Sequence, residues 1–289
     1  MSKQKFSVPR RVLMGIAIAI LAGVFLFSAF QLGKYAIESM QSKSTYDSLA
    51  QIMDEKKPSR PSIPLPSPTG DGSEPATLPT ETEPEYVTVT HPTTGEQMMI
   101  LPEFEELFQL NPNLVGWIEV PETRINYPVV QTPNSRDYYL RRDYYGNYDT
   151  HGCIYAREQC DVFRPTDNIT IYGHRMQDGS MFADLIKYAS KDFYDQNPYI
   201  YFDTLTERHT YQVMAVFKTT ATVGEGFRYH AFVDAANAEE FSQFVDTCKS
   251  LAFYNTGVGA KYGDKLITLS TCEYSQENGR LVVVAKRII

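Results

Sequence analysis

An uninterrupted apolar run near the N-terminus constrains this chain more than any other feature. The run extends from Val12 to Phe30 without a charged side chain, and its length is sufficient for a helix to cross a bilayer. Four basic residues precede it, which favours a cytoplasmic N-terminus, and the QLGK sequence that follows is a poor signal-peptide cleavage site. We therefore expect a cytoplasmic tail at 1–11, a transmembrane anchor at 12–30 and the remaining chain outside the cell.

Proline and acidic residues dominate the segment that follows. Nine prolines lie between Pro58 and Pro92, and residues 61–123 carry eleven acidic and no basic side chains. Proline blocks helix and sheet, and like charges repel one another. We therefore expect residues 31–102 to form a juxtamembrane segment, with weak helical periodicity, and a disordered stalk. Residues 124–289 are nearly neutral, so neither charge nor motif predicts a nucleic-acid partner.

Short apolar runs separated by turn residues fill the rest of the chain, from about residue 103 to 289. The clearest helix is expected at 238–251, with Asn237 as its N-cap, and a shorter one at 181–188. Many strands with few helices predict a mainly β domain, built as a closed or nearly closed barrel with helical insertions. The expected strands are 114–120, 124–131, 168–172, 208–219, 266–272 and 280–289.

Three residues at the ends of predicted strands carry the candidate chemistry. Cys272 ends a strand, His174 follows another, and Arg280 begins the last one. A thiol with a pKa of about 8.5 needs a neighbour that takes its proton, and histidine suits this role. An arginine can stabilise the thiolate and the oxyanion of a tetrahedral intermediate. The set predicts acyl transfer through a covalent cysteine intermediate.

Each of these residues alone has a plainer explanation. A cysteine at a strand end is more often a core residue, and the histidine and arginine are more often surface groups. The remaining cysteines also favour structural roles. Cys153 and Cys160 leave a disulfide and independent core packing both open, and Cys248 lies on the apolar helix face. Their spacing matches no common ligand pattern, so we expect no metal and no cofactor.

Taken together, the motifs resemble those of the sortase family. Thr-Leu-Ser-Thr-Cys272 is similar to the T-L-x-T-C signature, and Tyr-Gly-His174 to the histidine turn. Arg280 stands where the family has its catalytic arginine. The Cys-Glu-Tyr continuation, the spacing to Arg280 and the helix before the cysteine strand are most similar to class B sortases. The resemblance covers residues 103–289.

This resemblance implies an eight-stranded β-barrel in which Cys272, His174 and Arg280 meet at a substrate groove. It also implies a transpeptidase that cleaves the C-terminal sorting signal of secreted proteins through a thioester. The acceptor would be an amine of a cell-wall precursor, or a pilin lysine in polymerising members. By position, the backbone amide of Glu273 is expected to be a second oxyanion donor. Ser270 and Thr271 are expected to shape the groove.

Two other functions remain open on the residues alone. The same three residues would serve a secreted thiol hydrolase, because they do not determine whether water or an amine accepts the acyl group. An inactive, membrane-tethered binding module would keep the barrel without the chemistry. The sorting motif and the acceptor are not specified by the sequence.

Overall fold

The computed structural model describes residues 9–60, 63, 84–222, 224–275 and 277–289. Its first element is α1 (Arg10–Lys56), a single helix where the sequence suggested an apolar span and a separate, weakly helical segment. Within the described residues, α1 is the one helix long and apolar enough to cross a membrane, and its most apolar part is exposed. The chain divides into two compact units, residues 1–44 and residues 45–289.

The second unit begins earlier than expected. Tyr46, Leu49 and Met53 from the last turns of α1 are buried in the same core as the barrel. The compact unit that contains the barrel therefore starts before residue 103, because these apolar side chains are part of its core. The part of the expected stalk at 61–62 and 64–83 lies outside the described residues.

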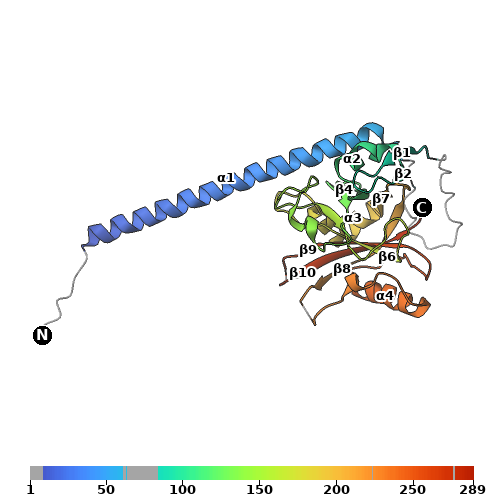
Figure 1. Ribbon diagram of the computed structural model, residues 1–289. Helices are drawn as coiled ribbons and strands as arrows, with labels where there is room; N and C mark the ends of the chain where they lie inside the picture. The colour runs from blue at the N-terminus through green and yellow to red at the C-terminus, as the bar shows by residue number, and fades with distance from the viewer. Residues whose placement is uncertain (1–8, 61–62, 64–83, 223, 276) are drawn as a thin grey trace. The chain divides into compact units, whose positions relative to one another are not determined.

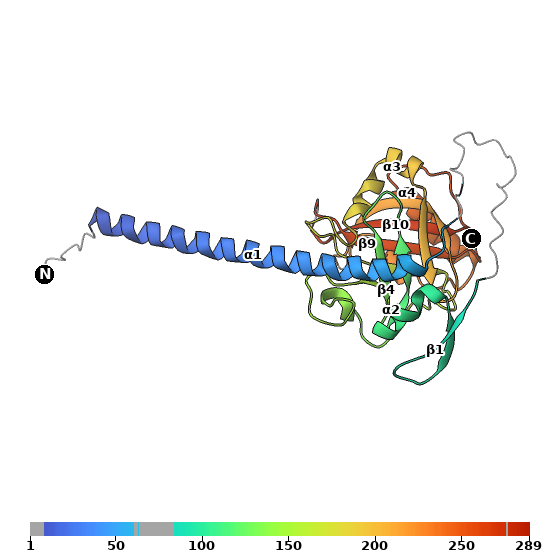
Figure 2. The same cartoon turned by 90° about the horizontal axis from the view of Figure 1, so that it is seen from above.

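A hairpin also occupies part of the segment expected to be a disordered stalk. β1 (Val87–Thr90) pairs antiparallel with β2 (Gln97–Ile100), and the hairpin projects from the barrel in Figure 2. Val89 and Ile100 are buried, which ties its base to the core. This part of the segment is thus a short hairpin whose inward side chains are apolar.

The body of the second unit is a closed barrel of eight strands, which confirms the predicted fold class (Figure 1). Around the barrel the order is β10, β8, β7, β3, β4, β5, β6 and β9, and β9 pairs with β10 to close it. Pairs β4–β5 and β6–β9 are parallel, and the other pairs are antiparallel. The strands are β3 (Leu114–Glu119), β4 (Asn126–Val130), β5 (Ile154–Ala156), β6 (Asn168–Tyr172), β7 (Tyr199–Thr204), β8 (Thr210–Thr220), β9 (Leu266–Cys272) and β10 (Gly279–Arg287).

Helix α4 (Ala238–Leu251) matches the predicted helix and covers β8 and β10 on the outside of the barrel (Figure 1). Its apolar stripe forms a second core with residues of these strands. The Asn237 side chain caps it by accepting from the Glu240 amide at 3.0 Å. Other helical elements are η1 (Pro102–Phe104), α2 (Glu105–Leu110), η2 (Tyr138–Arg141), η3 (Ala183–Ala189), α3 (Lys191–Gln196) and η4 (Tyr229–Ala231).

Candidate active site

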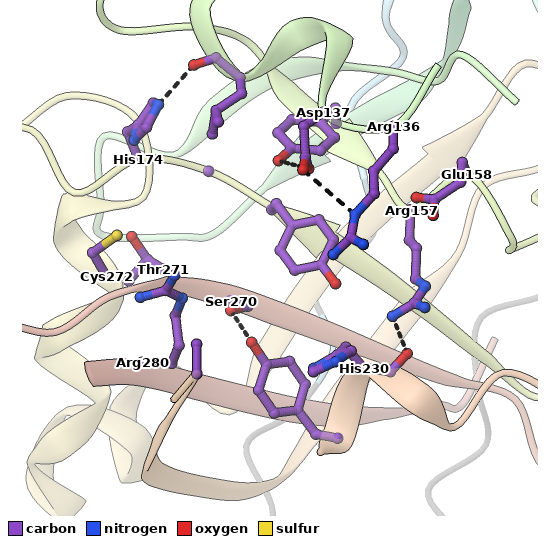
Figure 3. Close-up of a pocket in the computed structure, with 16 residues that line it drawn as sticks. Arg136, Asp137, Arg157, Glu158, His174, His230, Ser270, Thr271, Cys272 and Arg280 are labelled. Carbon is purple, nitrogen blue, oxygen red and sulfur yellow. Dashed lines mark hydrogen bonds and ion pairs between the residues drawn. The ribbon is translucent and has the colours of Figure 1, made fainter. Parts of the chain in front are cut away.

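Strand register brings the three predicted residues to one end of the barrel. Arg280 on β10 is the direct antiparallel partner of Cys272 on β9, so their side chains share one face. Strand β6 runs parallel to β9 with Tyr172 level with Ser270, and the Gly173 amide continues the pairing by donating to the Ser270 carbonyl at 3.2 Å. The same register, continued for two more residues, places His174 level with Cys272. The three residues line one cavity (Figure 3).

The imidazole of His174 is held by a backbone carbonyl. Its Nε2 lies 2.7 Å from the oxygen of Leu140 in η2, drawn as a dashed line in Figure 3. A carbonyl only accepts hydrogen bonds, so Nε2 carries the proton and Nδ1 is left to act as a base. Burial lowers the pKa of His174 below 6.5. The bond to Leu140 raises this pKa, but the positive charges of Arg141, His151 and Arg280 act in the same direction as burial, and the net effect is a lowered pKa. The ring is therefore neutral at neutral pH.

Gly173 is needed here for close packing. A Cβ at this position would lie 2.5 Å from the Ile154 side chain and 2.7 Å from the Phe182 ring. Gly173 is not among the residues with positive φ, so its backbone conformation does not itself require glycine. Its missing side chain instead lets the histidine turn approach the core.

We expect Gly173→Ala to destabilise the protein by about 1–3 kcal/mol, because an added methyl must displace buried side chains. Thermal unfolding of the detergent-solubilised chain measures the change. Gly259→Ala is the matched control, since a Cβ there meets open space and the φ needs no glycine. Equal unfolding temperatures for the two variants would contradict the close-packing role.

The guanidinium of Arg280 lies over the end of β9 that carries Cys272 and Thr271 (Figure 3). Its Nη1 donates to the carbonyl of Gly279 at 2.9 Å and more weakly to that of Asn278 at 3.3 Å. No acidic side chain forms an ion pair with Arg280 among the described residues. A partly buried cation without a fixed carboxylate is suited to receive a developing negative charge.

The backbone amide of Glu273, the expected second oxyanion donor, is engaged in another hydrogen bond in this structure. Its N–H donates to the Gly279 carbonyl at 2.9 Å. This N–H is therefore already used in the β9–β10 turn and does not point to an oxyanion in this structure. The Glu273 carboxylate is buried and pairs with Lys218 at 3.1 Å. Burial alone would raise the pKa of Glu273, but hydrogen bonds from Ser275 and Lys218 outweigh burial and lower that pKa. Glu273 thus supports the turn that follows Cys272.

Ser270 and Thr271 both line the cavity, in the positions expected of groove residues. The Ser270 hydroxyl lies 2.6 Å from that of Tyr229 in η4, which also lines the cavity. Thr271 Oγ1 is buried and has no hydrogen-bond partner in the part of the chain that the structure describes.

The cavity extends well beyond the three predicted residues and has a volume of about 220 Å³. Its remaining walls come from η2, β5, β6 and η4 and from the loop residues just before η2 and just after β5, and they combine aromatic rings with charged groups. Sequence motifs did not identify these residues, since they belong to separate segments without a local pattern. They include Arg136, Asp137, Leu140, Tyr155, Arg157, Glu158, Tyr172, Tyr229 and His230.

The other cysteines have structural positions. All four cysteines are free, so Cys153 and Cys160 are not bonded to each other. Both are buried, as is Cys248 on the inner face of α4, whereas Cys272 is partly exposed at the cavity. Burial raises the pKa of Cys153 to about 12, and it also raises that of Cys160. These thiols are protonated and poorly nucleophilic. In the described residues, no group of three His, Cys, Asp or Glu side chains is placed to hold a metal ion.

Comparison with known proteins identifies the family to which this fold belongs. The family model described as the sortase domain matches residues 118–288. Sortase B of Staphylococcus aureus is 34% identical over 66% of this chain and 77% of its own length, and sortase B of Listeria monocytogenes is 28% identical over 93% and 94%. Among solved structures, an S. aureus sortase B–substrate complex superposes with a TM-score of 0.67 at 28% identity, covering 87% of this chain and 98% of that one.

The chain therefore belongs to the sortase family, which consists of cysteine transpeptidases. The relatives and structural neighbours that it matches are class B sortases. This confirms the resemblance that the motifs indicated.

Proposed function

We propose that this protein is a membrane-anchored transpeptidase in which Cys272, His174 and Arg280 are the catalytic residues. The observation that carries the proposal is their convergence, through strand register, on one cavity. The apolar part of α1 at 12–30 is the proposed anchor, with residues 1–11 in the cytoplasm and the barrel outside the cell. The exposed apolar surface of α1 and its basic N-terminal flank support this placement.

The proposed reaction begins when the Cys272 thiol gives its proton to His174. The thiolate attacks a peptide carbonyl in the sorting signal of a secreted protein, and the fork of Arg280 stabilises the oxyanion. Collapse of this intermediate breaks the peptide bond, and His174 returns the proton to the departing amine. The thioester is then attacked by an acceptor amine, which loses a proton and releases the thiol.

The proposed substrates are secreted proteins with a C-terminal sorting signal, and the proposed acceptor is an amine of a cell-wall precursor. A sortase B has been solved as a substrate complex. Another structure holds sortase B with triglycine, and it is 34% identical to this chain with a TM-score of 0.59. Triglycine begins with a free amine, which supports an amine as the second substrate here.

Transfer and hydrolysis are distinguished by one product analysis. The detergent-solubilised chain is incubated with peptides from secreted proteins of the same organism that end in a short motif, an apolar run and a basic tail. With triglycine present, we expect mass spectrometry to find the cleaved peptide joined to triglycine. Hydrolysed product alone at every triglycine concentration would identify a thiol hydrolase. Absence of any cleavage across the panel would favour a binding module.

A further inference from the structure

A second histidine lies buried close to His174 and is not used in the proposed reaction. The side chain of His151 is 1% exposed, and its two ring nitrogens face two carboxylates. Nδ1 is 3.0 Å from Asp149 Oδ1, and Nε2 is 2.8 Å from Asp178 Oδ2. Carboxylates accept hydrogen bonds, so both nitrogens carry protons and the ring is an imidazolium. Burial alone would lower the pKa of His151, but the two aspartates outweigh it and raise that pKa.

The two carboxylates belong to different segments of the chain. Asp149 precedes His151 in the loop that leads into β5, whereas Asp178 lies in the loop that follows His174. That second loop folds back on the catalytic turn, because the Phe182 amide donates to the carbonyl of His174 at 2.8 Å. Asp178 also accepts from the Ser180 hydroxyl at 2.6 Å. His151 thus fastens the loop that emerges from His174 to a neighbouring loop.

The loop of His151 also packs against the group that holds the His174 ring. Gly152 has a φ of 62°, and a Cβ there would lie 2.5 Å from the Leu140 carbonyl oxygen. The amide of Cys153 donates to the Tyr139 carbonyl at 3.0 Å, which fixes the loop to η2. The Leu140 oxygen is the one that accepts from His174 Nε2. The loop of His151 is therefore bound to the segments on both sides of this hydrogen bond, to η2 through Cys153 and to the loop after His174 through the His151 side chain.

We propose that His151 is a positioning residue that holds the imidazole of His174 against Leu140 by linking Asp149 to Asp178. The inference rests on the proposed function, because it assigns His174 the proton transfer. A buried imidazolium between two carboxylates is costly to break, since removal of one partner leaves an unpaired charge. The link therefore keeps Nε2 of His174 protonated and Nδ1 presented as the base.

Two substitutions at His151 separate the two arms of this link. His151→Gln places an amide nitrogen near the position of Nε2 and keeps a bond to Asp178, whereas His151→Asn places it near Nδ1 and keeps only Asp149. His209→Asn is the matched control, because His209 is also buried but lies far from the cavity along β8. His209 lies where β8 begins, whereas Thr219, which pairs with Arg280, lies near the other end of that strand. All variants are compared in the full chain in detergent micelles.

The first measurement is steady-state kinetics with a sorting-signal peptide and triglycine. We expect His151→Asn to lower kcat about 10- to 100-fold with KM changed less than about threefold, because misplacement of a catalytic group slows chemistry more than binding. On a logarithmic scale, the decrease in kcat for His151→Gln should be at most about half of the decrease for His151→Asn. His209→Asn should leave kcat unchanged. Wild-type kcat in His151→Asn would overturn the proposal.

The second measurement does not depend on turnover. The chain has five histidines, so a protein labelled with 15N at histidine gives few ring signals, and His174→Ala assigns that of His174. We expect the wild type to show an Nε2–H tautomer protected from exchange with water by Leu140. His151→Asn should lose this protection, and His209→Asn should retain it. Retained protection in His151→Asn would overturn the proposal even if the protein proved not to be a transpeptidase.

A variant from the other side of the link covers the case in which His151→Asn does not fold. Asp178→Ala removes the same contact from a side chain that is 20% exposed, and it should reproduce both the kcat loss and the loss of protection. A purely structural link would lower the unfolding temperature in both variants while kcat and the His174 signal of the folded protein stayed at wild-type values. That result would contradict positioning.

Discussion

Replacement of Cys272 by alanine is expected to abolish cleavage and transfer, with a loss of at least about 10⁴-fold in kcat, as for removal of a covalent nucleophile elsewhere. The side chain is partly exposed at the cavity and contributes little to the core, so the unfolding temperature should stay close to that of the wild type. Product formation by mass spectrometry and thermal unfolding measure the two quantities. Intact-protein mass spectrometry should also detect a thioester on the wild type and none on Cys272→Ala.

Cys248→Ala makes the same chemical change at a thiol that is fully buried on the inner face of α4. This control should keep wild-type kcat and lose about 1 kcal/mol of stability through its effect on packing. Turnover at the wild-type rate in Cys272→Ala would show that this thiol is not the nucleophile. The same turnover in Cys248→Ala is what the structure requires, because that thiol lies outside the cavity.

Arg280→Ala is expected to lower kcat about 10²- to 10³-fold, since it removes a donor from the developing oxyanion in a partly enclosed site. Its direct pairing with Cys272 across β9 and β10 puts Arg280 next to the proposed nucleophile in the strand register. Arg280→Lys should recover only part of the loss, because an ammonium keeps the charge but not the planar fork. Single-turnover rates with a sorting-signal peptide measure the effect on acylation.

Arg287→Ala is the control on the same strand, at the end of β10 away from the cavity. It should leave the acylation rate unchanged. A rate close to that of the wild type in folded Arg280→Ala would refute the oxyanion role of Arg280. Loss of folding in Arg280→Ala would contradict the structure, in which its side-chain bonds are confined to the β9–β10 turn.

Local sequence patterns determined several elements closely. The apolar stripe and the cap at Asn237 predicted α4 with the bounds that the structure shows, and the apolar run at 266–272 predicted β9. The short strands β5 and β7 and the hairpin β1–β2 were missed. Each of them is only three to six residues long, which is too short to establish a period, and tertiary packing supplies their stability.

The sequence by itself determined the chemical identity of the candidate site, because Cys272, His174 and Arg280 stand in motifs at the ends of apolar strands. Only the tertiary structure decided how these residues meet. Pairing of β9 with both β10 and β6 sets Arg280 opposite Cys272 and brings His174 level with it. The structure also showed that the Glu273 amide is occupied and that His151 links the loops around His174. Such contacts join segments far apart in the chain, and local periodicity carries no information on register between them.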